Sequence, residues 1–250
     1  MRVKEEIKER YDGFAEKIDK SGIERIRFLH NEVSPVTKYF RKRKIETALQ
    51  LGRFIKGSKI LEIGSNVGQN TTMLAKEGLQ MIGIDISDKA VEVARKNAQA
   101  LNLKNIKYFP ADAENLSLFD NETFDGVVSF STLRYVPNLK QALGEIYRVT
   151  KKGGIAVLDF PNKDCPWFAL LKNKFGVENH IHDNFFTKRG LIKLFNEIGF
   201  KNVETKKILF THYTFKPEFL GLYKIIDSIG ENTWLLREFA AIILCKGIKL

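Results

Sequence analysis

The stretch Leu61-Glu62-Ile63-Gly64-Ser65-Asn66-Val67-Gly68 decides the fold of this 250-residue chain. It completes a short apolar run at 59–63 and opens an amphipathic segment at 68–77, which predicts a strand, a tight turn and a helix. Gly64 and Gly68 allow the turn and a close backbone approach to a ligand. Because a helix N-terminus presents unpaired N–H groups, the unit is suited to bind an anionic group.

Working outward from this unit, short apolar runs alternate with amphipathic ones. Such alternation predicts an α/β fold, with a parallel sheet covered by helices on both faces. The strands are apolar almost throughout, as expected for strands buried on both sides. Strands are expected at 59–63, 80–84, 106–109, 123–130, 154–160, 203–210 and 239–245, and helices at 68–77, 88–101 (with Ser87 as N-cap), 139–149 and 187–198.

The remaining segments are expected to surround this core within one domain, residues 1–250. Residues 1–56 predict a helical cap, with helices at 3–18 and 39–55 and a break at Ser34-Pro35. Residues 57–160 form the predicted binding core. The aromatic-rich segments 161–186 and 211–236, the second with a helix near 219–229, are expected to form a lid.

Composition and charge restrict the setting of the protein. The formal net charge is +11, which favours a solvated basic surface or an anionic partner such as nucleic acid or a membrane surface. No apolar run approaches the ~20 residues that cross a bilayer, and the charged N-terminus predicts no secretion signal. Cys165 and Cys245 stand far apart without CxxC spacing, so a reducing cytoplasm is expected.

An acidic residue stands where the second strand ends. Asp85 follows Gly64 by 21 residues, and a carboxylate in this place accepts hydrogen bonds from ribose hydroxyls. Dinucleotide sites require GxGxxG, but position 66 is Asn and position 69 is Gln. A glycine turn that only packs strand on helix is the alternative, and Asp85 argues against it.

Five motifs in register carry a family resemblance. They are Leu61-Glu62-Ile63-Gly64-x-x-x-Gly68, Ile84-Asp85-Ile86-Ser87, Ala111-Asp112-Ala113-Glu114, Phe124-Asp125-Gly126-Val127-Val128-Ser129 and Arg148-Val149-Thr150-Lys151-Lys152-Gly153-Gly154. The chain resembles the class I S-adenosylmethionine-dependent methyltransferases, in their small-molecule branch with the ubiquinone/menaquinone-type enzymes. The resemblance implies a Rossmann-like doubly wound sheet of seven strands, mostly parallel, with the last strand antiparallel.

The same resemblance implies roles for individual residues, with S-adenosylmethionine as the cofactor. The turn of Gly64, Ser65, Asn66 and Gly68 would contact the methionine end, and Glu62 would support its amino group. The family prefers glycine where this chain has Asn66. Further cofactor contacts are implied for Asp85 (ribose), Ile86 (adenine face), Asp112 and Ala113 (adenine edge), Ser129 with Phe130 (path to the methyl group), and Tyr11 in Tyr11-Asp12-x-x-Ala15 (closing segment).

Catalytic candidates are few, because methyl transfer from a sulfonium mainly requires alignment and exclusion of water. Tyr135 follows the fourth strand, where related enzymes often place polar residues, and His182 is a candidate base on the acceptor side. His180-x-His182-Asp183 could ligate a metal. Ordinary polar loop residues are the favoured interpretation of that triplet, so no metal site is predicted.

The acceptor is predicted from the segments outside the core. Their aromatic residues, including Trp167, Phe186 and Trp234, favour an apolar small molecule, with a lipid-like or isoprenoid compound as a candidate. RNA is the alternative acceptor, favoured by the net charge and by the run Arg41-Lys42-Arg43-Lys44. No RNA-binding module is visible. A non-catalytic binding protein with this fold is the third interpretation.

Overall fold

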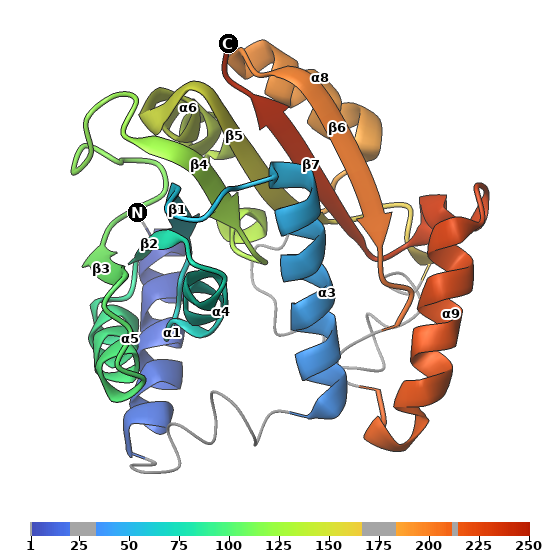
Figure 1. Ribbon diagram of the computed structural model, residues 1–250, viewed down its shortest axis with the longest axis horizontal. Coiled ribbons are helices and arrows are strands. Elements are labelled where there is room, and N and C mark those ends of the chain that lie inside the picture. Colours follow the sequence, from blue (N-terminus) through green and yellow to red (C-terminus); the bar gives the residue numbers. More distant parts are fainter. Residues whose placement is uncertain (1, 21–33, 167–183, 212–214) are drawn as a thin grey trace.

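Seven strands form one mixed sheet in the computed structural model, which describes residues 2–20, 34–166, 184–211 and 215–250 (Figure 1). Their order is β3-β2-β1-β4-β5-β7-β6, and β7 runs antiparallel to both of its neighbours while β1 to β5 are parallel. This confirms the predicted sheet. The strands are β1 (Lys59–Ile63), β2 (Gln80–Asp85), β3 (Ile106–Pro110), β4 (Phe124–Ser129), β5 (Thr150–Pro161), β6 (Lys201–Ile208) and β7 (Ile242–Ile248).

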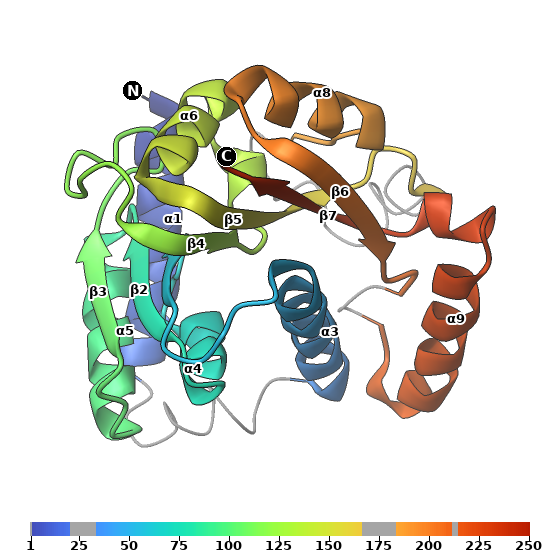
Figure 2. The ribbon, with the colours of Figure 1, turned by 45° about the horizontal axis from the view of Figure 1, so that its top comes forward.

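Helices cover both faces of the sheet (Figure 2). On one face, α3 and α4 enclose an apolar cluster that includes Ile45, Leu74 and Val157, and on the other α6 and α8 enclose a cluster that includes Leu143 and Phe195. The helices are α1 (Arg2–Lys20), α3 (Pro35–Gly52), α4 (Gln69–Lys76), α5 (Asp88–Ala100), α6 (Leu139–Val149), α8 (Lys188–Ile198) and α9 (Leu220–Asn232), with 3-10 turns η1 (Leu133–Tyr135), η3 (Pro217–Phe219) and η4 (Leu236–Phe239).

Alternation along β1 decides which face each side chain reaches. Ile60 belongs to the cluster under α3 and α4, whereas Leu61 and Ile63 belong to the cluster under α6 and α8. Because strand side chains alternate with a period of two, Glu62 shares the face of Ile60 and lies against α4, where it is fully buried.

Two predicted boundaries differ from the structure for local reasons. The second helix, α3, begins at Pro35 rather than at 39, so Ser34 and Pro35 mark its start: the Ser34 hydroxyl accepts from the Val36 N–H (3.3 Å), and Pro35 occupies the first turn. Both residues are favoured at these positions. β7 begins at Ile242 rather than 239, because residues 236–239 form the 3-10 turn η4.

The strand order creates a switch point between β1 and β4. The chain leaves β1 toward β2 and leaves β4 toward β5, on opposite sides, and such a point opens a crevice at the carboxyl ends of the strands. The Ser129 hydroxyl joins the two strands there by donating to the Ile63 carbonyl (3.1 Å). Among the described helices, none has the length and apolar character to cross a membrane.

Candidate functional site

A cavity of about 380 Å³ lies over the switch point. Its walls come from the turns after β1, β2, β3 and β4, from the start of β7, and from helices α1 and α3. The two N-terminal helices therefore complete a site whose floor is the edge of the sheet. Of the residues predicted to contact a cofactor, those lining the cavity are Tyr11, Gly64, Ser65, Asn66, Asp85, Ile86, Asp112 and Ala113; Tyr135 lines it as well.

The turn after β1 depends on backbone conformations that glycine and asparagine tolerate. Gly64 has φ +76°, and a Cβ placed on it would lie 2.0 Å from Thr132 Oγ1. Asn66 has φ +47°, in the left-handed region where asparagine is the commonest residue after glycine. Its Oδ1 accepts from the Val67 N–H (2.7 Å). Asn66 is thus a conformational substitute for the glycine that the family prefers there.

Asp85 ends β2 with its carboxylate on the cavity wall. Its Oδ2 accepts from the Asn66 N–H (2.8 Å) and its Oδ1 from the Ser87 N–H (3.0 Å). Burial raises the pKa of Asp85, and these two backbone donors only partly offset that effect. The Ile86 backbone also interacts with this carboxylate. Because a carboxylate has about four acceptor positions, it retains capacity for a hydroxyl in the cavity.

Helix α1 closes the same end of the cavity with polar contacts. Lys4 Nζ donates to Asp112 Oδ2 (2.6 Å) and to Glu114 Oε2 (2.7 Å). Burial lowers the pKa of Lys4, but the hydrogen bonds to the two carboxylates outweigh it and raise the pKa above its ordinary value. Asp112, predicted to meet an adenine edge, therefore already has a cationic partner from α1.

The Tyr11-Asp12-x-x-Ala15 segment begins about two turns further along α1. Tyr11 lines the cavity and is hydrogen-bonded to Tyr135, whereas Asp12 accepts from the Ser87 hydroxyl (2.5 Å). Burial raises the pKa of Tyr11, and the nearby Asp85 carboxylate adds to this effect. Ala15 has no exposed surface and packs in an apolar cluster with Val67 and Ala90. One side of the motif therefore packs against the domain, and the other lines the cavity.

Polar atoms without a partner gather where β1 meets α4. Ser65 Oγ and Gln69 Nε2 are buried and have no hydrogen-bond partner within the part of the chain that the structure describes. Arg41 Nη2 donates to Gln69 Oε1 (2.5 Å). Burial raises the pKa of Glu62 to about 7, against the opposing effects of the Thr71 hydroxyl, the Asn70 side chain and the Arg41 charge. A zwitterionic group would find both donors and an acceptor here.

The opposite end of the cavity is mostly apolar and contains one buried cation. Lys44 Nζ donates to Ser131 Oγ (2.6 Å) and to Asp159 Oδ2 (2.9 Å), and it lies 5.5 Å from the centre of the Phe40 ring and 6.0 Å from that of Phe130. The Ser131 N–H donates to Asp159 Oδ1 (2.5 Å). Thr37, Ala241 and Ile242 complete this end.

Comparison with known proteins agrees with this geometry. A family model described as a methyltransferase domain matches residues 61–158. An S-adenosyl-L-methionine-dependent Diels-Alderase of Talaromyces variabilis is 32% identical over 168 residues (61% of this chain, 56% of the relative). A demethylmenaquinone methyltransferase of Listeria welshimeri is 30% identical over 145 residues (56% of this chain, 61% of the relative). The chain thus spans less than two thirds of the length of either relative.

The fold has a close match among solved structures. A putative methyltransferase of Haloferax volcanii, solved in complex with the Trm112 methyltransferase activator, superposes with a TM-score of 0.65 at 17% identity, over 95% of this chain and 96% of that chain. Residues 61–158 of this chain therefore form a methyltransferase domain.

The cavity over the switch point fits the amino-acid and ribose portions of S-adenosylmethionine, the cofactor that one relative's name includes. The unpartnered Ser65 Oγ and Gln69 Nε2, with Arg41 beside them, match the charged amino-acid portion. The remaining acceptor capacity of Asp85 matches a ribose hydroxyl. The donor and acceptor chemistry of the lining residues thus corresponds to that of the cofactor.

Three predicted cofactor residues stand behind the cavity wall rather than on it. Glu62 lies beneath α4, bonded to the Thr71 hydroxyl, and Gly68 precedes α4. The Ser129 hydroxyl, which the family resemblance places on the path to the methyl group, is buried and donates to the Ile63 carbonyl. Because the chain turns after β4, the side chains of residues 130–132 reach the cavity instead.

Of the two aromatic residues at the apolar end, the family resemblance implies Phe130, whereas Phe40 is not among the predicted residues. Phe40 and Phe130 line the cavity, whereas Phe186 packs against Phe160 in the core, with ring centroids 5.0 Å apart. Among the described residues of 211–236, none lines the cavity. Trp167, like most of 161–186, lies outside the described residues.

The four basic side chains of residues 41–44 do not lie together on one exposed surface, as the RNA-binding interpretation would require. Arg41 and Lys44 point into the cavity, and Arg43 forms an ion pair with Glu231. Lys42 alone of the four is exposed, 3.6 Å from Glu46. The run therefore does not form the surface patch that nucleic-acid binding requires.

Sequence reasoning missed Lys4, Arg41, Lys44 and Asp159 as site residues. Helical spacing was an available signal for α3, since positions 37, 40, 41 and 44 share one face. His180, His182 and Asp183, the candidate base and metal ligands, lie outside the described residues. Within the described residues, no group of three or more His, Cys, Asp or Glu side chains is placed to hold a metal ion.

Proposed function

We propose that the protein transfers a methyl group from S-adenosylmethionine to a small molecule that has an apolar body and one polar group. One observation carries the proposal: the same cavity is lined by Asp85 and Tyr11 at one end and by Phe40, Phe130 and Lys44 at the other. A donor and an acceptor can therefore be held together away from bulk water, which is the main requirement of this reaction.

The cofactor supplies a methyl group on a positively charged sulfur, from which it leaves without a metal or an added activating group. Residues of this chain would then hold the acceptor in line and exclude water. Phe40, Phe130 and Ile242 offer apolar surface for a flat or lipid-like body. A lipid-like or isoprenoid compound with an oxygen substituent is the acceptor that this surface favours.

Lys44 is the residue that would recognise the polar group. An ammonium has three N–H donors, and two of them are used by Ser131 and Asp159, which leaves one for an acceptor oxygen. The Asp159 carboxylate balances the buried charge, and the positive charge of Lys44 would lower the pKa of an acceptor hydroxyl, so that the deprotonated oxygen that attacks the methyl carbon is present before the new bond forms. Lys44 thus orients the oxygen and favours its reactive form.

Transfer of a labelled methyl group tests this proposal. The purified protein is incubated with methyl-labelled S-adenosylmethionine and, separately, lipid extract, water-soluble small molecules and RNA. We expect label in the lipid or small-molecule fraction, and its loss in Asp85→Ala. Label in RNA would contradict the acceptor class. Binding of the cofactor without methyl transfer to any fraction would contradict the proposed reaction. This outcome is tested separately because one relative is named as a Diels-Alderase rather than a methyltransferase.

Lys42 offers a matched control for Lys44. Lys44→Met should lower kcat/KM for the acceptor about 10- to 100-fold, the value of one hydrogen bond from a charged donor, while the Kd for S-adenosylmethionine stays within about twofold. Lys42→Met removes the same charge from the same helix and should change neither quantity. Equal effects of the two variants would mean that Lys44 acts only through net charge.

A further inference from the structure

Helix α9 presents an unusual distribution of side chains. It stands at one end of the molecule beside α3 (Figures 1 and 2). Its inward residues include two carboxylates, Asp227 and Glu231, and a glycine, Gly230, whereas its outward residues are mainly leucine and isoleucine. This is the reverse of the usual surface helix, which turns its apolar stripe toward the protein.

Polar contacts hold α9 in place. Asp227 accepts from the N–H groups of Phe210 (2.6 Å) and Thr211 (3.1 Å) and from the Thr211 hydroxyl (3.0 Å). Glu231 accepts from the Leu209 N–H (3.0 Å) and forms an ion pair with Arg43 of α3. These carboxylates fix which face of α9 is turned outward, so the apolar face is exposed by the way the helix is anchored.

The neighbourhood of Gly230 explains why the helix sits so close on that side. A Cβ at this position would lie 2.4 Å from the Phe210 ring, so only glycine allows the approach. The inward face is thereby closed to larger side chains. Apolar residues of α9 have no room to turn inward.

The outward face is large and continuous with the turn that follows. Positions 219, 222, 226 and 229 follow helical spacing, and the chain carries further apolar residues into η4. Monomeric soluble proteins rarely expose apolar patches of this kind without a partner. The exposed fractions are Phe219 52%, Leu222 53%, Ile225 58%, Ile226 41%, Ile229 59%, Trp234 70%, Leu235 56%, Leu236 45% and Phe239 48%.

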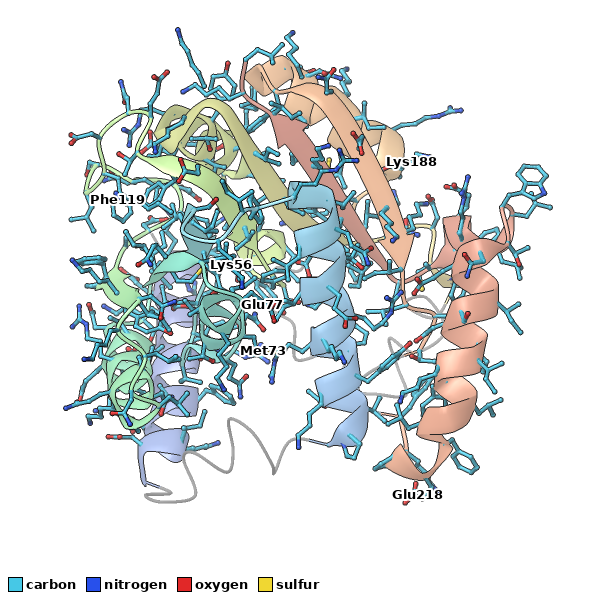
Figure 3. All side chains as sticks on the ribbon, in the orientation of Figure 1. Lys56, Met73, Glu77, Phe119, Lys188 and Glu218 are labelled. Carbon is cyan, nitrogen blue, oxygen red and sulfur yellow. The ribbon has the colours of Figure 1, made fainter. Side chains whose placement is uncertain are left out.

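Charges around this face favour an anionic surface as its occupant. Lys216, Lys224 and Arg237 are exposed around it, while Glu218 is the one exposed carboxylate of residues 215–239, at the tip before α9 (Figure 3). The other acidic residues there face inward or, like Glu238, are paired with lysines. A second copy would bring three cations against three, each on a chain of net charge +11.

We infer that α9 and η4 form a docking face for a bilayer that contains anionic lipids, with the apolar residues inserted at the headgroup boundary and the cations beside the headgroups. Interfacial helices have this combination of leucine, isoleucine and tryptophan with flanking cations. The face also adjoins the acceptor end of the cavity: η4 leads within three residues to Ile242, and Arg43 ties α9 to the helix that carries Lys44. Under the proposed function, docking would therefore place that end near a lipid-like acceptor.

Vesicle co-sedimentation tests the docking. We expect the protein to bind vesicles that contain phosphatidylcholine and phosphatidylglycerol. Binding should be weaker to vesicles of pure phosphatidylcholine, and weaker to the mixed vesicles at high salt concentration. Leu222→Gln/Ile225→Gln/Ile229→Gln should reduce partitioning at least about tenfold. Ile55→Gln/Leu118→Gln, at apolar positions that are 75% and 55% exposed elsewhere, is the matched control and should leave partitioning unchanged.

Two further measurements separate the outcomes. Calorimetric binding of S-adenosylmethionine should be equal in both variants, which distinguishes loss of docking from loss of the cofactor site or of the fold. Equal vesicle binding by the triple variant, or no binding by the native chain, would overturn the inference. So would a native dimer that the triple variant converts to a monomer in sedimentation velocity, because the occupant would then be a second copy.

Discussion

Replacing Glu62 by glutamine should stabilise the protein at alkaline pH. The carboxyl group is completely buried beside Thr71, and burial raises its pKa from 4.5 to about 7. A raised pKa means that the folded state holds the proton more tightly than the unfolded state does. Stability from this group is therefore fully present below pH 4.5 and is lost as the pH rises to about 7.

The size of the effect follows from the shift. At about 1.4 kcal/mol for each pH unit, the ionised carboxylate lowers the free energy of unfolding by about 3 kcal/mol above pH 7. A glutamine keeps the acceptor for the Thr71 hydroxyl and carries no charge. The free energy of unfolding of Glu62→Gln should therefore be higher than that of the native chain by about 3 kcal/mol at pH 8 and by less than about 1 kcal/mol at pH 5.

Urea unfolding followed by circular dichroism measures the free energy of unfolding at pH 5 and at pH 8. Asp120→Asn removes an exposed carboxylate and is the control; it should change this free energy by less than about 0.5 kcal/mol at either pH. The m-value should stay constant, so that the midpoint alone reports stability. The same variant should bind S-adenosylmethionine more weakly, because the charge near Arg41 is lost. A difference in unfolding free energy that is equal at both pH values would refute the reasoning, since the pH dependence comes from Glu62 ionisation.

Further predictions concern the lysine contacts of Lys44 and Lys4 at the two ends of the cavity. Lys44→Met should lower the free energy of unfolding by about 3–5 kcal/mol, because it leaves the Asp159 charge buried without a partner. The double variant Lys44→Met/Asp159→Leu should recover most of that loss. If urea unfolding finds the double variant no more stable than the single one, the pairing of Lys44 with Asp159 is contradicted. Lys4→Ala should speed release of S-adenosylmethionine about fivefold in stopped-flow fluorescence, since it removes the contact between α1 and Asp112 (about 1 kcal/mol). Lys8→Ala removes an exposed lysine of the same helix, paired with Asp88, and an equal effect there would contradict the specific role of Lys4.

The core of the fold could be predicted because its signals are local. The stretch around Gly64 specifies strand, turn and helix within a few residues, and β1 has the predicted bounds. Ser87 caps α5 as expected, its hydroxyl accepting from the Ala90 N–H (2.9 Å). Asp85 could be placed on the cavity for the same reason, because parallel strands end at one edge of the sheet.

The rest of the site depends on contacts between distant residues. Lys4 meets Asp112 across 108 residues of chain, and Lys44 meets Asp159 across 115; no local pattern encodes either pairing. For α9, the periodicity predicted a helix but not its orientation. The helix turns its carboxylates inward because Asp227 and Glu231 accept from backbone N–H groups of residues 209 and 210, directly after β6. This contact depends on the position of the sheet and is not encoded in the local sequence of α9.

Titration calorimetry with S-adenosylmethionine tests the central claim, that the cavity over the switch point is the cofactor site. The native chain should bind one equivalent. Asp85→Ala should weaken binding at least about tenfold, the value of one hydrogen bond to a charged acceptor, and Asp120→Ala, which removes an exposed carboxylate outside the cavity, should leave the Kd unchanged. Equal affinity of Asp85→Ala and the native chain would contradict the account.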